Sequence, residues 1–408
     1  MHKVVVTGRG VVSPIGRNLQ ENKDSLYEGK SGLSFIEHWS EIELQSQVAG
    51  FVKDKKFDCP LLDKKTRRFS SDNAIMSIVA AYEAMQEADL AVDSFRHMNV
   101  AVINGCASSG YSEIYASAEK YIKTKRLRSV SPFVVPRVMP SSAVANLSIV
   151  LGITGESYDI SAACASSSMA LVMASRMIRA GLYDMVVVGG SEELNWVQTL
   201  GFDAMRALST KYNDNPEKSS RPFDTSRDGF VIAEGAGVMI LESEEHAKAR
   251  GAEIKAYLSS AVANSNATDM VVPDAATNVK LMTKALEEAE LEPEDIDYIN
   301  THGTATIIGD PVELASIKEA FGNETAFNST KSQTGHMIGA TGIVEAIFTT
   351  IMMENSFISP TLNLVELDNE YSSMNVISQT TSKQIKHALT NSFAFGGSNS
   401  CLIFSKPN

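Results

Sequence analysis

Short apolar runs rich in β-branched residues alternate with longer runs at helical spacing through most of this chain. The runs KVVVTG, NVAVIN, DMVVVGG and GVMILES are typical of buried strands. The segments 72–90 and 165–182 instead predict helices, and the first should begin at a cap formed by Ser71 or Asp72. Strands that alternate with helices in this way predict an α/β fold with a parallel or mixed sheet.

One strand-turn-helix pattern occurs twice. DISAACASSSMALVMASRMIRAG places Cys164 in a small-residue turn before a long helix, and FNSTKSQTGHMIGATGIVEAIFTTIMMEN places His336 in a similar turn. The repetition predicts two similar halves, at 1–250 and 251–408, connected through 245–254. No low-complexity linker separates them, so we expect the halves to pack tightly.

Charge and composition narrow the classes of function. The net charge of −13, from 36 basic and 49 acidic residues, disfavours a general role in nucleic-acid binding. The chain starts without a signal peptide, and no apolar run approaches the roughly 18 residues of a membrane span. The four cysteines are far apart and form no CxxC pair, which disfavours a zinc ribbon or a disulfide framework and favours the cytoplasm.

Cys164 is the first candidate for chemistry. A cysteine at a helix start faces the positive end of the helix dipole and unpaired N–H groups. Both effects predict a lowered thiol pKa and a reactive thiolate. The alternative is a buried structural cysteine, since free cysteines are among the most buried residues.

Two of the seven histidines lie in glycine-flanked turns after strand-like runs, His302 in NTHGTAT and His336 in SQTGHMIG. α/β folds place site residues on loops beyond strand ends, although a lone histidine is more often structural. Lys331 precedes His336 by five positions and either holds a carboxylate or lies at the surface. Glu313 and Glu345, on the helices predicted after the two turns, are candidate partners for Lys331 or for a cation.

The segment TNSFAFGGSNSCLIF at 390–404 predicts a strand, a Gly-Gly turn and a second strand. Glycines let backbone N–H groups face a ligand oxygen, as an oxyanion hole requires. An ordinary hairpin is the alternative.

Together these stretches resemble the β-ketoacyl-acyl-carrier-protein synthases, which are condensing enzymes with the thiolase fold. The similarity runs nearly from end to end, through VVVTGRGVVSPIG, ISAACASSS, GGSEELNW, NTHGTAT, STKSQTGHMIGATG and NSFAFGGSNS. Within the family the chain looks most like the elongating synthase I, on GGSEELNW and FDAMRALSTKYNDNPEKSSRPFD. The resemblance implies two pseudo-duplicated halves in αβαβα layers.

The resemblance also implies an activity, namely decarboxylative condensation of an acyl thioester with malonyl-acyl carrier protein in fatty acid elongation. Cys164 matches the nucleophile that carries the acyl chain. His302 and His336 match the histidines that hydrogen-bond the thioester oxygen as malonate loses carbon dioxide. Lys331 matches a lysine of the same motif, and Glu313 is its expected ion-pair partner.

Further roles are implied for the residues around these groups. The N–H groups of Cys164 and Phe395 match the oxyanion hole, and Phe395 also matches a gating phenylalanine. Thr304 and Thr306 match residues that bind the phosphopantetheine arm, so no separate organic cofactor is expected. A structural cation site is implied near Asn300, Glu345 and Ser392.

Acyl carrier protein is acidic, so the basic islands are candidate docking sites, although solvated surface is the alternative for each. The docking candidates are Lys64, Lys65, Arg67, Arg68, Lys125, Arg126 and Arg128. The family implies a homodimer, and a heterodimer with a silent chain-length-factor subunit is the alternative.

Two departures from the family pattern leave the pathway open. Ala394 stands where relatives have a glycine next to the gate, and we expect a cost of about 1 kcal/mol if its φ is positive. The EGAG stretch at 234–237 looks more like synthase II. A ketosynthase of a specialised polyketide or aryl polyene-type pathway is therefore the alternative function.

Other classes fit the sequence less well. A degradative thiolase needs a second cysteine where this chain has Phe393 and Phe395, and synthase III uses one histidine and an asparagine. A chain-length factor lacks the nucleophilic cysteine. An NAD enzyme is unsupported because TGRGVVSPIG lacks the G-x-G-x-x-G spacing.

Overall fold

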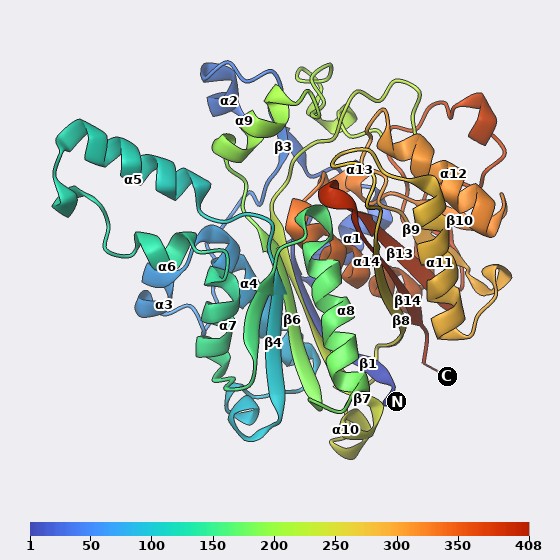
Figure 1. Ribbon diagram of the computed structural model, residues 1–408, viewed down its shortest axis with the longest axis horizontal. Coiled ribbons are helices and arrows are strands. Elements are labelled where there is room, and N and C mark those ends of the chain that lie inside the picture. Colours follow the sequence, from blue (N-terminus) through green and yellow to red (C-terminus); the bar gives the residue numbers. More distant parts are fainter. Residues whose placement is uncertain (408) are drawn as a thin grey trace.

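A ten-stranded mixed sheet runs through the molecule (Figure 1). The computed structural model describes residues 1–407. From one edge to the other the strands are β5 (Ser157–Ile160), β4 (Val100–Gly105), β6 (Met185–Glu192), β7 (Gly235–Ser243), β1 (Val4–Val12), β8 (Ala256–Ser265), β14 (Ser398–Ser405), β13 (His387–Phe393), β9 (Tyr298–Asn300) and β10 (Ala326–Asn328). Two short ribbons accompany them, β2 (Leu33–Phe35) with β3 (Val48–Gly50) and β11 (Phe357–Ile358) with β12 (Thr381–Ser382).

The two halves of the sheet have the same pattern of parallel and antiparallel pairs when each is followed from the centre to its edge. β1 is antiparallel to β7, which is antiparallel to β6, and β6, β4 and β5 are parallel. β8 is antiparallel to β14, which is antiparallel to β13, and β13, β9 and β10 are parallel. The two sets join where β1 pairs antiparallel with β8. This order confirms the predicted α/β fold with two duplicated halves, whereas the exact boundary at residue 250 stays a prediction.

Helices occupy three layers around the two halves of the sheet. The helices are α1 (Leu19–Glu28), α2 (Glu37–Glu41), α3 (Lys64–Phe69), α4 (Asp72–Glu87), α5 (Tyr111–Thr124), α6 (Val134–Val138), α7 (Ser142–Leu151), α8 (Ser166–Arg179), α9 (Trp196–Ala204), α10 (Glu244–Ala249), α11 (Ala275–Ala289), α12 (Gly309–Phe321), α13 (Lys331–Thr334) and α14 (Thr341–Asn355). α4 and α7 cover the first half of the sheet, and α11 covers the second. α8 and α14 pack on each other and contact both halves, which gives the αβαβα order.

The middle layer explains the apolar composition of its two helices. In α14 every residue from Thr341 to Met353 is buried, and α8 buries most of its length. A helix that is apolar on all sides is the kind that folds inside a large core. Ser71 is the N-cap residue of α4, as the sequence predicted, but its hydroxyl donates to Asn73 and makes no capping hydrogen bond.

The two related turns that precede α8 and α14 lie against each other. Both are short 3-10 turns, η3 (Ala163–Ala165) and η6 (Ile338–Ala340), and they are in contact. The first residue of each has a left-handed backbone, with φ of 47° at Ala163 and 42° at Ile338. Such a conformation is costly for a residue other than glycine and persists only where the surrounding structure enforces it.

α5 projects from the body of the molecule (Figure 1). Every residue of this helix is exposed or half-buried, including the apolar side chains Ile114, Tyr121 and Ile122. Within residues 1–407, we find no helix with the length and apolar character needed to span a membrane.

Candidate active site

Three side chains from both halves of the chain converge at one point. Cys164 lies on η3, His302 follows β9, and His336 lies between α13 and η6. One donor atom of each residue lies within 4.8 Å of the other two. The two imidazole rings are 5.3 Å apart and nearly perpendicular, at 89°. The structure therefore brings together the three residues that the sequence singled out for chemistry.

The turn around Cys164 is built from small residues because backbone segments approach closely there. The Ser166 hydroxyl accepts a hydrogen bond from the N–H of Ala162 and donates one to the carbonyl of Ala163, which closes the turn. A Cβ on Gly105, at the end of β4, would lie 2.3 Å from the nitrogen of Ser167. Cys164 is thus held on a tight turn directly before α8, with 9% of its surface exposed.

The predicted lowering of the Cys164 pKa is wrong. Burial raises the pKa of this thiol to about 12 and outweighs the nearby Lys331 cation and the N–H groups of Phe395 and Cys164 itself, which lower it. Desolvation disfavours a charged sulfur more than these groups favour it. The resting residue is therefore a thiol at neutral pH, and acyl transfer needs a base within reach.

Both histidines are neutral for the same reason. Burial, followed by repulsion from Lys331, holds the pKa of His302 and of His336 well below 6.5. Nδ1 of His336 lies 3.0 Å from the hydroxyl oxygen of Thr341, a partner that the sequence analysis missed. Among the described residues, Nε2 of His336 and Nδ1 of His302 have no hydrogen-bond partner. The two rings therefore offer ring nitrogens for chemistry.

Glu313 has a different role from the one expected. Its carboxylate accepts hydrogen bonds from the N–H groups of His302, at 2.8 Å, and Gly303, at 2.6 Å. The predicted ion pair between Glu313 and Lys331 is therefore wrong. Glu313 instead fixes the backbone that carries His302.

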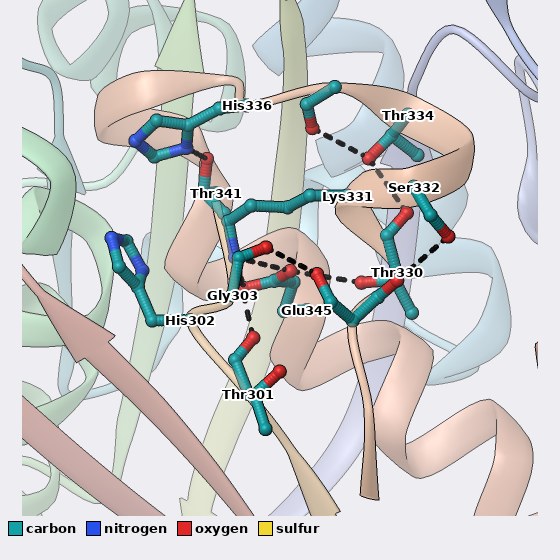
Figure 2. Close-up of polar contacts among 12 residues, drawn as sticks. Thr301, His302, Gly303, Thr330, Lys331, Ser332, Thr334, His336, Thr341 and Glu345 are labelled. Carbon is teal, nitrogen blue, oxygen red and sulfur yellow. Dashed lines mark hydrogen bonds and ion pairs between the residues drawn. The ribbon is translucent and has the colours of Figure 1, made fainter. Parts of the chain in front are cut away.

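The partner of Lys331 is Glu345, the other carboxylate considered from the sequence. Both side chains are 1% exposed, and Nζ lies 2.7 and 2.8 Å from the two carboxylate oxygens. Figure 2 shows Lys331 extending from α13 with its Nζ bonded to Glu345 on α14, where the Thr330 hydroxyl also donates to the carboxylate. Of the two alternatives considered for Lys331, the structure therefore supports the one in which it holds a carboxylate, and the pair is buried.

Only part of the donor set predicted for the structural cation is free of other hydrogen bonds. Glu345 is engaged by Lys331 and Thr330. Both polar side-chain atoms of Asn300 are buried without a partner in the part of the chain that the structure describes, and Ser392 is 3% exposed. A cation at this place stays a prediction.

A cavity of about 280 Å³ is lined by Cys164, His302 and His336. Thr304 and Thr306 also line it, and their hydroxyl oxygens are 3.1 Å apart. Further lining residues that the sequence analysis missed are Met205, Arg206, Phe230, Met270, Val271 and Ile307.

The comparisons with known proteins agree with this geometry. The family model "Beta-ketoacyl synthase, N-terminal domain" matches residues 1–247, and "Beta-ketoacyl synthase, C-terminal domain" matches residues 252–365. The chain belongs to the β-ketoacyl synthase family. It is 40% identical to 3-oxoacyl-[acyl-carrier-protein] synthase 1 of Escherichia coli K12, over 100% of this chain and 99% of that protein. The resemblance to synthase I is thereby confirmed.

Solved structures give the same result for the fold. A β-ketoacyl synthase from Burkholderia phymatum superposes with a TM-score of 0.94 at 32% identity, with both chains fully covered. The AntDE:AntF complex, a type II polyketide ketosynthase with its acyl-carrier protein, superposes at 0.90 with 30% identity, again with full coverage. The synthase therefore has the ketosynthase fold, and the polyketide neighbour is similar at lower identity than the E. coli synthase.

The backbone conformation of Ala394 does not carry the free-energy cost that was expected for a positive φ. Its backbone is extended, with φ of −113° and ψ of 154°, which any residue adopts. The left-handed positions of the loop are Gly396 and Gly397, with φ of 81° and 72°. Phe395 lines the cavity, and the N–H of Gly396 donates to the carbonyl of Met270 at 2.8 Å. An effect of Ala394 must therefore arise when the loop moves.

Ala394→Gly tests that remaining hypothesis. Because glycine removes the steric limit on a change of φ, we expect a faster acylation of Cys164 with little change in thermal stability. Stopped-flow acylation with an acyl donor in excess measures the rate. An unchanged rate would show that Ala394 does not restrain the gate, and Ala388→Gly, in the preceding strand β13, is a control for loss of packing.

Because both histidines are neutral, we expect an unusual acid limb in the pH–rate profile of malonyl-carrier protein decarboxylation. A histidine of ordinary pKa becomes charged as the pH falls through 6.5, whereas these two stay neutral well below that value. The rate of malonyl-carrier protein decarboxylation should therefore not fall with an apparent pKa near 6.5 on acidification. A pH–rate profile of carbon dioxide release, on protein shown to stay folded by circular dichroism, checks this. A midpoint at the ordinary histidine value would contradict it.

Proposed function

We propose that this synthase carries an acyl chain on Cys164 and condenses it with malonyl-acyl carrier protein, giving 3-oxoacyl-acyl carrier protein and carbon dioxide. The observation that carries the proposal is the meeting of one thiol and two neutral imidazoles at the inner end of a cavity. A thiol supplies the covalent acyl carrier, and neutral imidazoles supply hydrogen bonds to developing oxyanion charge.

Acylation is the first half of the proposed reaction. The Cys164 thiol gives its proton to a neighbouring imidazole as the sulfur attacks the thioester carbon of the donor. The N–H groups of Phe395 and Cys164 both point at the sulfur. They are thus placed to bind the carbonyl oxygen of the tetrahedral intermediate next to it. As the intermediate collapses, the imidazolium returns its proton to the leaving sulfur, which releases the carrier thiol, restores the neutral ring and leaves the acyl group on Cys164.

Decarboxylation and condensation form the second half. The thioester oxygen of the malonyl group lies between His302 and His336, and each neutral ring donates one N–H to it as carbon dioxide leaves. The enolate carbon then attacks the acyl carbon on Cys164, which forms the new carbon–carbon bond and releases the sulfur. Lys331 and Glu345 act indirectly, through the two histidine rings, because the lysine charge helps keep both rings neutral.

Mass spectrometry of intact protein tests the proposal and identifies the chain. The synthase is incubated with a panel of acyl-carrier proteins that bear saturated, unsaturated and aryl-polyene acyl groups. We expect one acyl adduct that maps to Cys164. Preference for saturated or monounsaturated chains supports fatty acid elongation, and preference for polyene chains supports the specialised pathway. Absence of any adduct on Cys164 would overturn the covalent mechanism.

The partner surface is proposed from the basic islands. All seven docking candidates are exposed, four on α3 and three just after α5. Phe69 of α3 packs edge-to-face against Phe133 at 5.0 Å, and the Arg68 guanidinium lies over the same ring, so the α3 island is held beside the segment that follows the second island. Each island is a positive patch that suits an acidic carrier protein.

Charge reversal tests the docking region. Lys64→Glu with Arg67→Glu should raise KM for the carrier-protein substrate by about 10-fold or more, because like charges then face each other. The value of kcat should change little, and the wild-type KM should rise with salt. Steady-state kinetics with the carrier protein measures this. Lys284→Glu, an exposed lysine on α11, is the matched control. An equal effect at both places would contradict the assignment.

We also propose a dimer that forms along β5. This strand lies at the edge of the sheet, and α5, which projects from the body of the molecule, presents the exposed apolar residues Ile114 and Ile122. Pairing of two β5 strands would extend the sheet, and a partner subunit offers the apolar side chains of α5 a surface to pack against. Light scattering of the purified chain distinguishes a homodimer from a monomer that needs a different subunit. The cytoplasm is the proposed compartment, and it suits the four free thiols.

A further inference from the structure

The donor atoms of the active site have the chemistry of a transition-metal site. Cysteine sulfur and imidazole nitrogen are the ligands that Zn²⁺ prefers, and three protein ligands with one open position are typical of reactive zinc sites. Cys164, His302 and His336 each present one donor atom, and the three atoms lie within 4.8 Å of one another. From this geometry we propose that the synthase binds one Zn²⁺ or a similar soft divalent ion here, and that the bound ion blocks acylation of Cys164.

The distances need only a modest contraction. Zn–S and Zn–N bonds of about 2.3 and 2.1 Å place the ligand atoms of a tetrahedron about 3.5 Å apart. The separations in the structure reach 4.8 Å, so the donors must close by roughly 1 Å. Cys164 is a short side chain, and Nδ1 of His302 has no hydrogen-bond partner within residues 1–407. No hydrogen bond at that nitrogen has to break when the donors move together.

The surroundings prepare both rings as ligands. Each ring has a buried nitrogen without a hydrogen-bond partner among residues 1–407, Nε2 in His336 and Nδ1 in His302. The Thr341 hydroxyl, 3.0 Å from Nδ1 of His336, is able to accept the Nδ1 proton. In that tautomer the lone pair of Nε2 is available to the metal. The condensation step uses the other tautomer, in which the Thr341 hydroxyl donates to Nδ1 and Nε2 carries the proton, so metal binding selects between the two. The Lys331 cation, which disfavours a proton on either ring, also opposes a dication at this place, and its pairing with Glu345 at 2.7 Å reduces that repulsion.

Binding exchanges a proton for the metal. The Cys164 S–H bond breaks, sulfur forms a bond to Zn²⁺, and the proton leaves to solvent through the cavity. One proton is released for each ion bound, so the affinity should rise with pH. When Cys164 is acylated or alkylated, its sulfur is no longer available as a thiolate ligand. Metal and acyl group therefore exclude each other on the same sulfur.

Co²⁺ is the spectroscopic probe for this site. The reduced resting synthase, stripped with a chelator, is titrated with Co²⁺ alone and then with Zn²⁺. We expect one equivalent to produce a thiolate-to-cobalt charge-transfer band and intense tetrahedral visible bands, which one equivalent of Zn²⁺ removes. Binding is measured without substrate, so it succeeds or fails independently of the proposed condensation.

Variants decide which residues hold the ion. Loss of an outer partner costs about 10–100-fold in metal affinity, so loss of the sulfur in Cys164→Ala should cost more than about 100-fold and abolish the charge-transfer band. Thr341→Val should keep the band and lower the affinity about 10-fold. Cys59→Ala, at another buried cysteine, should change neither, and alkylation of Cys164 should act like its removal.

Several results would overturn the proposal. These are the absence of a charge-transfer band in the wild type, its persistence in Cys164→Ala, or binding only to surface histidines without thiolate character. Circular dichroism of each variant excludes unfolding as the cause of a lost band. Inhibition of acylation by Zn²⁺, relieved by a chelator, is the functional counterpart, and it should follow the same affinity as the cobalt titration.

Discussion

Cys164→Ala should reduce condensation by about 10⁴-fold or more, because it removes the only atom proposed to carry the acyl chain. The same variant should still release carbon dioxide from malonyl-carrier protein, since both imidazoles remain in place. Product analysis by mass spectrometry and a carbon dioxide assay measure the two activities separately. Elongation at a wild-type rate would show that the carrier of the acyl chain is elsewhere.

The histidine variants provide the complementary experiment. His302→Ala and His336→Ala should lose decarboxylation by about 10²-fold or more, because each removes one donor to the enolate oxygen. Acylation of Cys164 should survive better in at least one of the two, since the other ring can still accept the thiol proton. Cys106→Ala, at a buried cysteine outside the triad, is the control that should change neither activity.

Glu345→Ala should destabilise the synthase by about 3–5 kcal/mol, because it leaves the Lys331 ammonium buried without its counter-charge. The lysine and the glutamate are each 1% exposed, so neither charge can be solvated in place. The double variant Lys331→Met with Glu345→Leu should recover much of this loss, since an apolar pair of similar volume needs no counter-charge. Chemical denaturation measures the free energy of unfolding.

The activity of the double variant separates positioning from stability. Repulsion from Lys331 helps hold the pKa of both imidazoles low, after burial. Its removal should therefore raise those pKa values and move the acid limb of decarboxylation toward higher pH. Lys123→Ala, which breaks the exposed pair with Glu119, should leave stability and the acid limb unchanged. Equal losses in the single and double variants would contradict the ion-pair explanation.

The alternation of strand and helix patterns was enough to predict the α/β fold, because the runs are long and strongly apolar. The reactive turns were found for a local reason as well, since cysteine and histidine in small-residue turns are rare enough to stand out. The repeated pattern around Cys164 and His336 also pointed to the duplication that the strand order shows.

Two conclusions needed three-dimensional distances. Glu313 and Glu345 both lie on helices after a histidine turn, and only the folded arrangement assigns the first to backbone N–H groups and the second to Lys331. The pKa of Cys164 depends on burial, which the local sequence does not record. The helix-start argument considered only the groups that favour the thiolate, and desolvation exceeds them.

The duplicated turns have a consequence for how reactive groups are distributed between the halves. Ala163 and Ile338 are the matching left-handed residues, so Gly339 stands where the second half would carry its own nucleophile. A Cβ at Gly339 would lie 2.4 Å from the nitrogen of Ala107, so no side chain fits there. The two turns thus offer equivalent backbone positions for a reactive side chain, but the close approach of Ala107 leaves room for one only at Cys164. The duplicated fold therefore has a single nucleophile position between its two halves.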